Sequence, residues 1–413
     1  MLGIDTVLLL AFSLPWPLKY RIFPMEGTPY IFFGVYFALL FAYIALDVGW
    51  IRTRTLQGRW RAKLTVLIAV IVIAAGGPLV TAIVDRSQVA PVFGVHDIIL
   101  QLEAAMRYLI DGINPYRATY FGTHMEAWRY AELGRDAVNP ALYHFVMPPW
   151  YLLFSFFFYP FVKIFGFFDG RLPLLFTFFG TLTLLAVWIK DYQKKILALI
   201  IVAFHPVMFD YLLEGRSDHF AFFWLLFALF LWQRKKIVLA AAVYALALLS
   251  KQTIWLSLPF VFLYVWKDVM RQSVTRIVLV ISALLGTLAL VLGPFLVWDA
   301  RSYWESTVVF LQGTTPVSYP VAGYGWGMVL YQLGVIKDIH AYYPFVYWQA
   351  AIGIPTLWFL IRWFQAKISA GRLLISYGVF LFVFWYFSRY FHNSHLGYIS
   401  LVLGTGYLVD DAT

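Results

Sequence analysis

The chain has 413 residues, of which 62% are hydrophobic, 20% aromatic and only 13% charged. Soluble domains carry roughly twice that share of charged residues, so the composition excludes an ordinary soluble protein and indicates an all-α polytopic membrane protein. The net charge of +10 does not indicate binding to nucleic acid, because the basic residues lie in short loops between apolar runs. The absence of cysteine excludes disulfides, thiolate metal sites and cysteine nucleophiles.

Short basic segments set the expected topology. Five segments hold 17 of the 31 Lys and Arg residues but only two acids, Asp191 and Asp268. These segments are 51–63, 190–195, 233–236, 267–276 and 362–372. By the positive-inside rule they face the cytoplasm. Every apolar stretch between two of them must therefore leave the cytoplasmic side and return to it.

The N-terminal part supplies the first expected crossings. The apolar run at its start lacks a basic region before it and therefore does not indicate a cleaved signal peptide, although residues 4–20 could add one crossing. Residues 28–50 and 64–84 are each long enough to span a membrane, which takes about 20 helical residues. The second crossing brings the chain to the outer face at Asp85.

The first outer region extends from residue 85 to about residue 170. Two apolar runs, Trp150–Phe168 and Leu172–Ile189, precede the next basic segment. Only one of them can cross, because the chain must pass from the outer face to the cytoplasmic side. The first run is interrupted by Pro160 and Gly166, so we expect it to be re-entrant or interfacial and expect Leu172–Ile189 to cross.

Two hairpins come next, over residues 196–232 and 237–266. The first turns at Glu214–Asp218 and the second at Ser250–Thr253. Each arm of the second hairpin has about 14 residues, or roughly 21 Å of helix, which is shorter than the hydrocarbon core of about 30 Å. We therefore expect Lys251 to be recessed below the outer surface, in a cavity.

The C-terminal part supplies the remaining crossings and a second outer loop, residues 299–342. The expected crossings are 277–298, 343–361, 373–388 and 396–409, and a small polar apex lies at Arg389–His395. The total is about eleven crossings, or twelve if residues 4–20 also span. We expect residues 1–413 to form one integral membrane domain, with C-terminal helices in 299–413, and the sequence indicates no oligomeric state.

Asp97 is the first candidate for chemistry. Apolar residues in 98–110 fall on one stripe of a helix that begins at His96-Asp97, whereas Gln101 and Glu103 fall elsewhere, so this helix is expected to lie in the membrane plane. Asp97 could simply cap the helix, since Asp is favoured at helix starts. It could also act as a general base where a lipid-bound substrate meets water, and the two roles are compatible.

Lys251 and Arg216 are cations at outer apices between apolar arms. Ionisable groups at membrane depth are costly and usually face a cavity or a partner, and an anionic ligand such as a phosphate fits both. They could instead extend to the headgroups or pair with Glu214 or Asp218.

Arg389, His392 and His395 form a third outer polar group. The two histidines are three residues apart and could share a helix face, but no acidic ligand lies near them in the sequence, so we do not expect zinc.

The order of several short motifs resembles the C-type (GT-C) superfamily of integral-membrane glycosyltransferases. The motifs are the outer-loop Asp97, Asp111-Gly112-Ile113-Asn114-Pro115-Tyr116, Pro148-Pro149-Trp150-Tyr151, Glu214-Gly215-Arg216-Ser217-Asp218, Leu249-Ser250-Lys251-Gln252-Thr253 followed by Leu258-Pro259-Phe260, and a weaker match at Ser388-Arg389-Tyr390-Phe391-His392-Asn393. The resemblance covers residues 64–298, which include the outer region 85–170, and is strongest to the mannosyltransferase-like members that use polyprenyl-phosphate sugars.

The resemblance implies a reaction and roles for individual residues. A hexose or pentose, with a mannose-like sugar favoured, would pass from a polyprenyl-phosphate donor to a hydroxyl of a lipid, glycan or protein acceptor, with inversion at the anomeric carbon. Asp97 would activate the hydroxyl, and Lys251, Arg216 and Arg389 would contact the donor phosphate. Substrate-binding candidates are His96, Asp218, Gln252 and His392. The site would face outward from a prokaryotic cytoplasmic membrane.

The sequence departs from one group in the superfamily. Where oligosaccharyltransferases carry a metal-binding acidic pair, Asp218 is preceded by Arg216 and Ser217, so we expect neither a metal nor any other cofactor. Two alternatives remain: a lipid or solute transporter, which should show internal repeats and discontinuous helices, and a glycan ligase or polymerase that uses a pyrophosphate-linked oligosaccharide. The partners expected are the lipid-linked donor, a lipid or glycan acceptor and membrane lipids.

Overall fold

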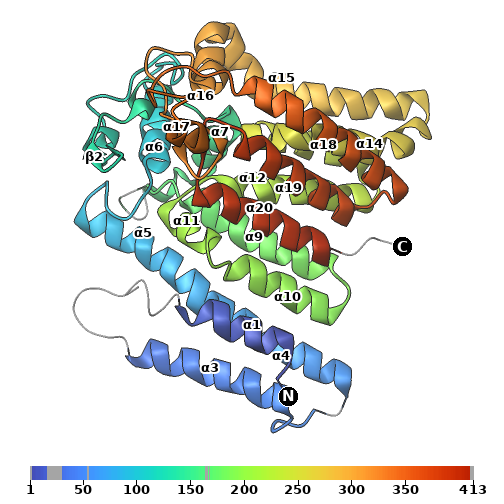
Figure 1. The fold of residues 1–413 in the computed structure, drawn as a ribbon. Helices are drawn as coiled ribbons and strands as arrows, with labels where there is room; N and C mark the ends of the chain where they lie inside the picture. The colour runs from blue at the N-terminus through green and yellow to red at the C-terminus, as the bar shows by residue number, and fades with distance from the viewer. Residues whose placement is uncertain (1, 16–29, 54, 163–165, 167, 410–413) are drawn as a thin grey trace.

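The computed structural model describes residues 2–15, 30–53, 55–162, 166 and 168–409. Helices contain 72% of the residues and strands 2%, so the helical class expected from composition is confirmed. Long helices lie side by side, and the short helices and irregular segments gather at one end, around α6 and β2 (Figure 1). Both expected outer loops contribute to that end.

The N-terminal helices form the lowest layer in Figure 1. They are α1 (Ile4–Ser13), α3 (Tyr30–Val48), α4 (Leu56–Ile71), the π-helical turn η1 (Val72–Gly76) and α5 (Gly77–Val89). The last three form one continuous helix of 34 residues. It begins at Leu56 because the Thr55 side chain accepts a hydrogen bond from the Gly58 amide and caps it. The expected basic loop 51–63 is therefore partly helical, and the helix continues past Asp85.

A buried group of charges joins these helices. Lys63 of α4 is 1% exposed, and its Nζ lies 2.5 Å from Asp5 Oδ2 of α1 and 2.8 Å from Asp47 Oδ1 of α3. The Tyr43 hydroxyl donates to the same carboxylate oxygen, Asp5 Oδ2 (2.5 Å). Charges among apolar helices are stable only when paired in this way, so the group holds α1 and α3 against α4. Sequence reasoning gave these residues no role.

The first outer region is built from short elements. They are α6 (Asp97–Ile110), η2 (His124–Ala127), β1 (Ala131–Glu132), β2 (Arg135–Asp136), η3 (Pro140–Leu142), α7 (Pro149–Ser155) and η4 (Phe156–Phe158). Helix α6 has the expected bounds, but the first half of its polar face is covered: Gln101 is 1% exposed and donates to the carbonyls of Ala141 and His144. Arg107 and Asp111, at its C-terminal end, are exposed.

The apolar run from Trp150 forms only a short helix. Together α7 and η4 contain ten residues, or about 15 Å, half of a hydrocarbon core. Residues 163–165 and 167 of the run lie outside the described residues. Helix α7 packs against α9 and α6, a position that fits the expected re-entrant path.

The central helices contain both expected hairpins. They are α9 (Leu172–Trp188), α10 (Tyr192–Ala203), α11 (Met208–Glu214), α12 (Asp218–Gln233), α13 (Ile237–Leu248), the 3-10 helix η5 (Gln252–Ser257) and α14 (Leu258–Met270). The apices fall at 215–217 and 249–251, where they were expected. The first outgoing arm is divided, because α10 and α11 meet at a bend of 50°.

The C-terminal helices cover the opposite side of the central group. They are α15 (Val274–Trp304), η6 (Glu305–Val309), α16 (Phe310–Gln312), α17 (Trp326–Gln332), α18 (Val346–Ala366), α19 (Ala370–Tyr386) and α20 (Asn393–Leu408), with strands β3 (Ala322–Gly323) and β4 (Tyr390–Phe391). The two strands pair in parallel and join the second outer loop to the apex before α20. These strands and the β1–β2 ribbon were not expected in an all-α chain.

In the part of the chain that the structure describes, three helices are long and apolar enough to cross a membrane: Tyr30–Val48, Leu56–Val89 and Val274–Gln312. The bent pair α10–α11 would make a fourth, and seven further apolar helices have 10–17 residues. Helix α1 ends at Ser13, and residues 16–20 of the expected first crossing lie outside the described residues. The structure therefore gives three or four spans by length, whereas the count of eleven or twelve stays a prediction.

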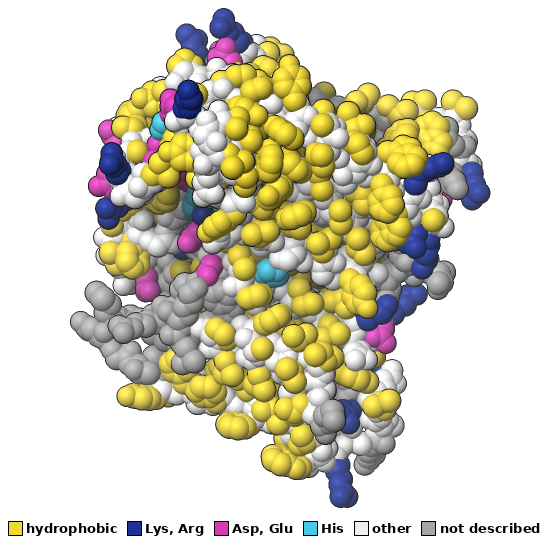
Figure 2. Space-filling view, viewed as in Figure 1, with side chains coloured by type: hydrophobic (Ala, Val, Ile, Leu, Met, Phe, Trp, Pro, Cys, Tyr) yellow, Lys and Arg dark blue, Asp and Glu magenta, His cyan; other side chains and the backbone are white. Residues whose placement is uncertain are grey.

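The surface is apolar between two charged ends. In Figure 2, hydrophobic side chains cover most of the visible face, Lys and Arg gather along the right-hand and lower right-hand edge, and both signs of charge occur at the end around β2. Leu290 and Val297 of α15 are 78% and 90% exposed. Such a surface is compatible with a lipid environment.

Replacement of Lys63 tests the buried charges of the N-terminal layer. We expect Lys63→Met to destabilise the protein by about 3–5 kcal/mol, because it leaves the buried Asp5 without its cation and Asp47 with only the partly exposed Arg59 at 3.4 Å. Lys235→Met is the control, since Lys235 is 74% exposed and pairs with Asp268 at the surface, where a pair contributes about 0–1 kcal/mol. The free energy of unfolding of both variants is measured in detergent micelles. Equal losses in the two variants would contradict this interpretation.

Candidate functional site

Asp97 is held at the start of α6 by the segment before it. His96 is the N-cap residue in an extended conformation, and Asp97 is the first residue of the helix. The His96 amide donates to the Glu214 carbonyl at the end of α11 (2.7 Å). The carboxylate therefore lies beside the apex of the first hairpin, although Glu214 follows Asp97 by 117 positions in the chain.

Gly215 allows this close approach. It terminates α11 with φ +96, and a Cβ atom at this position would lie 2.3 Å from Ile99 Cγ1 of α6. Only glycine tolerates both the left-handed backbone and the contact. The apex that carries Arg216 is thus pressed directly against the helix that carries Asp97.

The Asp97 carboxylate is buried and fully engaged. The residue is 5% exposed, its Oδ1 lies 2.6 Å from His96 Nδ1, and its Oδ2 accepts a hydrogen bond from Asn139 Nδ2 (2.7 Å). Burial alone would raise the pKa of Asp97, but His96, the bond from Asn139 and the charge of Arg216 together lower it. Asp97 is therefore ionised at neutral pH.

Lys251 lies at the apex of the second hairpin, as expected, and forms an ion pair. Its Nζ is 2.7 Å from Asp218 Oδ1; the lysine side chain is 24% exposed and the aspartate side chain 6%. Pairing with Asp218 was one of the two alternatives left by the sequence. The ammonium group keeps part of its surface accessible, so the pair fixes Lys251 without enclosing it.

Arg216 lies between the Asp97 and Lys251 groups. Its guanidinium donates to Ser394 Oγ (3.1 Å), approaches Glu214 (3.5 Å) and packs over the Tyr211 ring at 4.3 Å. Its charge acts on both Asp97 and Asp218. Desolvation, and after it the charge of Arg216, lowers the pKa of His392, the residue that caps α20.

Two of the expected site residues have other partners. Arg389 is 3% exposed and donates to the carbonyls of Tyr319, Ile339, His340 and Ala341. Gln252 donates to the carbonyls of Val146 (2.6 Å) and Thr307 (3.0 Å). Both side chains therefore hold the outer loops together, and the expectation that they contact substrate stays a prediction. His96, Asp97, Arg216, Asp218, Lys251 and His392 gather at the hairpin apices.

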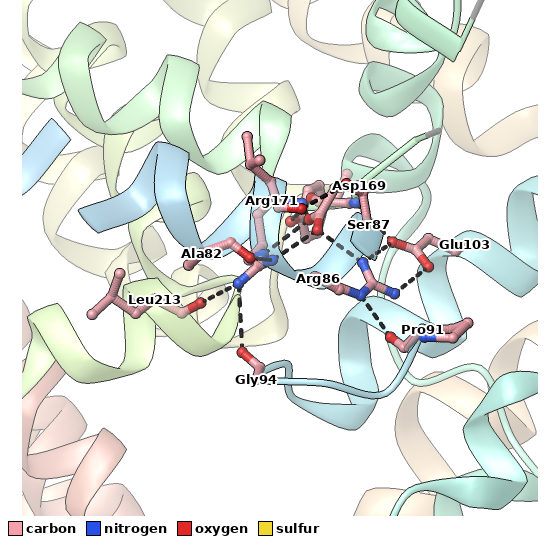
Figure 3. A network of polar contacts seen from close by, with 12 residues as sticks. Ala82, Arg86, Ser87, Pro91, Gly94, Glu103, Asp169, Arg171 and Leu213 are labelled. Atoms are coloured by element: carbon pink, nitrogen blue, oxygen red, sulfur yellow. Dashed lines mark hydrogen bonds and ion pairs between the residues drawn. The ribbon is translucent and has the colours of Figure 1, made fainter. Parts of the chain in front are cut away.

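A buried network beneath α6 was missed by sequence reasoning (Figure 3). Arg86 of α5 forms two bonds with Glu103 of α6 (2.7 and 2.8 Å) and contacts Asp169 at 3.0 Å. Arg171 contacts Asp169 through Nε and Nη2 (2.9 and 2.8 Å). The two cations and two anions balance each other. The sequence placed Glu103 on the polar face of an interfacial helix, whereas in the structure its side chain is largely buried.

Arg171 also connects the two parts of the candidate site. Its guanidinium donates to the carbonyls of Ala82 in α5, Leu213 in α11 and Gly94, which lies just before His96 (Figure 3). The side chain is 2% exposed. One buried arginine thus bonds both the segment that positions Asp97 and the helix that positions Arg216.

Some buried polar atoms near the ion pair have no hydrogen-bond partner among the described residues. They include Ser217 Oγ, next to Asp218, and Thr253 Oγ1, two residues after Lys251. Unpaired buried hydroxyls are unusual and require an explanation such as a bound group. Both lie beside the cations that were expected to contact a phosphate.

A cavity of about 430 Å³ lies between the two outer loops. It is lined by Glu132, Leu133, Arg135, Asp136, Ala137, Ile339 and His340. His340 Nε2 lies 2.9 Å from Glu132 Oε2 across it. Burial and the carboxylates of Glu132 and Asp97 raise the pKa of Tyr130, the residue just before β1.

No group of three or more His, Asp or Glu side chains in the described part of the chain could hold a metal ion. The expectation that the protein needs no metal and no cofactor stays a prediction. No protein-family model matches this sequence, and no curated protein matches it.

Arg171→Met tests the network in Figure 3. It leaves Asp169 without one cation and removes the bonds to three carbonyls, so we expect a loss of about 3–5 kcal/mol in the free energy of unfolding. Hydrogen exchange of the segments 94–98 and 211–216 should become faster, because both lose an anchor. Arg301→Met is the control at a side chain that is 87% exposed; comparable changes in this control would contradict a special role for Arg171.

Asp97→Asn tests the state of the buried carboxylate. A pKa below that of an unfolded aspartate, about 3.9, means that ionised Asp97 stabilises the fold above that pH and that this contribution disappears as pH falls through the lowered pKa. We therefore expect the variant to have a lower melting temperature than wild type at pH 7, and we expect this deficit to shrink progressively as the pH is lowered below about 3.9. A deficit independent of pH would show that the carboxylate charge does not matter.

Proposed function

We propose that the protein is a membrane glycosyltransferase that resembles the C-type superfamily and moves a sugar from a polyprenyl-phosphate donor to an acceptor hydroxyl. The observation that carries this proposal is that, at one end of the helices, Arg216 acts on both the buried, ionised carboxylate of Asp97 and the Asp218–Lys251 ion pair. Asp97 supplies the negative group, and Arg216 and Lys251 the positive groups. Proton removal and phosphate departure require these opposite charges on opposite sides of one reacting carbon.

The apolar surface supports a location in the membrane with the hairpin apices at the outer face. Helix α9 has 17 residues, or about 26 Å, and could cross where the bilayer adapts or where the apices are recessed. The eleven expected crossings would then be α3, α4–α5, α9, α10–α11, α12, α13, α14, α15, α18, α19 and α20. The positive-inside rule then directs the edge rich in Lys and Arg to the cytoplasm.

The cations suit the leaving group. When the bond between the anomeric carbon and the phosphate oxygen breaks, the phosphate gains negative charge, so fixed cations stabilise the transition state more than the ground state. Asp218 holds Lys251 in position while leaving it accessible. The hydroxyls of Ser217 and Thr253 provide donors beside the same cations. A mannose-like sugar, an inverting displacement and independence from metal remain parts of this proposal.

The acceptor would approach from the cavity between the outer loops. Glu132, Asp136, Arg135 and His340 offer both donors and acceptors for the hydroxyl groups of a glycan or lipid headgroup. The cavity volume lies within the range typical of small-ligand sites, about 300–1,000 Å³. In this arrangement the lipid donor and the polar acceptor reach Asp97 from different directions.

Transport is the second candidate, because α10 and α11 form a broken helix with a bend of 50°. Discontinuous helices near polar groups are typical of transporters. A transporter would bind lipid-linked sugar and move it without breaking the glycosidic bond. The two functions therefore differ in a product that can be measured.

A transfer assay tests the proposed function. Purified protein in liposomes is given radiolabelled polyprenyl-phosphate sugars, including mannose, and an extract of membrane acceptors. We expect transfer by wild type and a loss of at least about 100-fold in Asp97→Asn and in Lys251→Ala, which is the scale for a general base or a transition-state cation. Lys235→Ala, a surface lysine paired with Asp268, should keep wild-type activity.

The assay also separates the alternatives. Movement of intact lipid-linked sugar across the liposome membrane, with no transfer from any donor, would support a transporter and contradict the glycosyltransferase. Equal transfer by all four forms would remove Asp97 and Lys251 from the site.

A further inference from the structure

The surroundings of Asp97 do not suit direct attack on a substrate proton. Its Oδ1 contacts His96 Nδ1 at 2.6 Å, and its Oδ2 accepts the bond from Asn139. The side chain is 7% exposed, whereas that of His96 is 22% exposed. A substrate hydroxyl at this position reaches the imidazole more easily than the carboxylate.

The 2.6 Å contact determines which nitrogen of His96 carries a proton. Two acceptor atoms would repel each other at this distance, so a proton lies between Nδ1 and the carboxylate. The Ile98 amide is also near Nδ1, but at 3.4 Å, and Nδ1 cannot donate to Asp97 and accept from Ile98 at once. The shorter, charge-assisted contact is the stronger one, which makes Nδ1–H the donor and Nε2 the acceptor in a neutral ring.

The ring itself is held in place on two further sides. It packs against the Trp128 ring with centroids 5.5 Å apart, and the His96 amide is bound to the Glu214 carbonyl. No hydrogen bond from Nε2 occurs among the described residues. A fixed imidazole with one nitrogen bound to a carboxylate and the other available is the arrangement that general-base catalysis uses.

We propose that His96 Nε2 accepts the proton of the acceptor hydroxyl and that Asp97 is a positioning residue that orients the imidazole and stabilises its charged form. This inference rests on the proposed glycosyl transfer and assigns its proton acceptor. It changes the role of His96 from substrate binding and that of Asp97 from base to support.

The step is balanced without a further reactant. The acceptor oxygen forms a bond to the anomeric carbon while its proton moves to Nε2. The bond from the anomeric carbon to the phosphate oxygen breaks, and its electron pair leaves with the phosphate. The resulting imidazolium faces Asp97 and later gives its proton to water at the outer face.

Other charged groups act on this pair from neighbouring elements. Arg216 contributes a positive charge from the α11–α12 apex and Glu214 a negative charge from the end of α11, while Tyr130 and Tyr319 are electrostatically coupled to Asp97 from the two outer loops. His392 lies within reach of Arg216 from the start of α20.

The test compares the pH dependence of transfer in wild type, His96→Gln and Asp97→Asn, with saturating donor and defined acceptor extract. With a histidine base, the wild-type transfer rate falls as the pH drops below neutrality. With a carboxylate base, the rate falls only several pH units lower. We expect kcat to fall at least about 100-fold in His96→Gln, with the donor KM within about threefold of wild type. In Asp97→Asn, the pH at which the transfer rate falls should move to lower pH by about one unit or more.

Chemical rescue keeps the test valid if a variant folds poorly. Free imidazole should restore part of the activity of His96→Ala, because a folded site can use an external base, but should not restore that of Asp97→Asn, which keeps its own ring. His124→Gln is the control at an exposed histidine of the same outer region, and it should behave as wild type with no response to imidazole.

The outcomes separate this inference from the proposed function. Loss of transfer in His96→Gln together with imidazole rescue of His96→Ala would support the histidine base. Transfer within threefold of wild type in His96→Gln, with Asp97→Asn inactive, would overturn it and restore Asp97 as the proton acceptor, while the glycosyltransferase would stand. No transfer by wild type from any donor would overturn both.

Discussion

The arrangement of this protein depends on the buried ion network that fixes α6 beneath the hairpin apices. Arg86 and Glu103 join α5 to α6, and Arg171 bonds to the carbonyls of Leu213 and Gly94. Without this network, the segment that carries His96 and Asp97 would lose these links to α5 and α11 and would keep, among the described contacts, the close approach of Gly215 to Ile99 and the backbone bond from His96 to Glu214. A buried network must be complete to be stable, because an unpaired charge in such surroundings is strongly destabilising. The candidate site therefore depends on electrostatics outside it.

The same principle organises the site on a smaller scale. Asp97 and Lys251 each have a buried or partly buried partner of complementary character, His96 for the former and Asp218 for the latter. Each pair leaves one atom group accessible, the imidazole in one case and the ammonium in the other. The protein thus holds an acceptor of protons and a cation at fixed positions, and Arg216 acts on both groups. Such preorganisation is the condition under which charges accelerate a reaction instead of merely binding a substrate.

The sequence predicted the elements better than it predicted their partners. Hydrophobic periodicity gave the bounds of α6, and polar residues between apolar runs located both hairpin apices, because these features are local in the chain. The sequence could not show that Arg389 turns inward to four carbonyls or that Gln252 joins two loops, since these bonds connect residues 48–106 positions apart. It also missed the N-terminal charge group and the network around Arg171. In each of these two groups, the charged residues face buried partners of opposite charge, whereas the sequence led us to expect them to face solvent.

The central claim is that a polyprenyl phosphate binds beside Lys251 and Arg216, and it is tested most directly by photo-crosslinking. A polyprenyl phosphate with a diazirine next to the phosphate is incorporated into liposomes with the purified protein, and labelled peptides are identified by mass spectrometry. The account predicts labelling concentrated in residues 211–218 and 249–257, with competition by unlabelled polyprenyl phosphate. Labelling confined to the exposed apolar face of α15, and insensitive to the competitor, would contradict it.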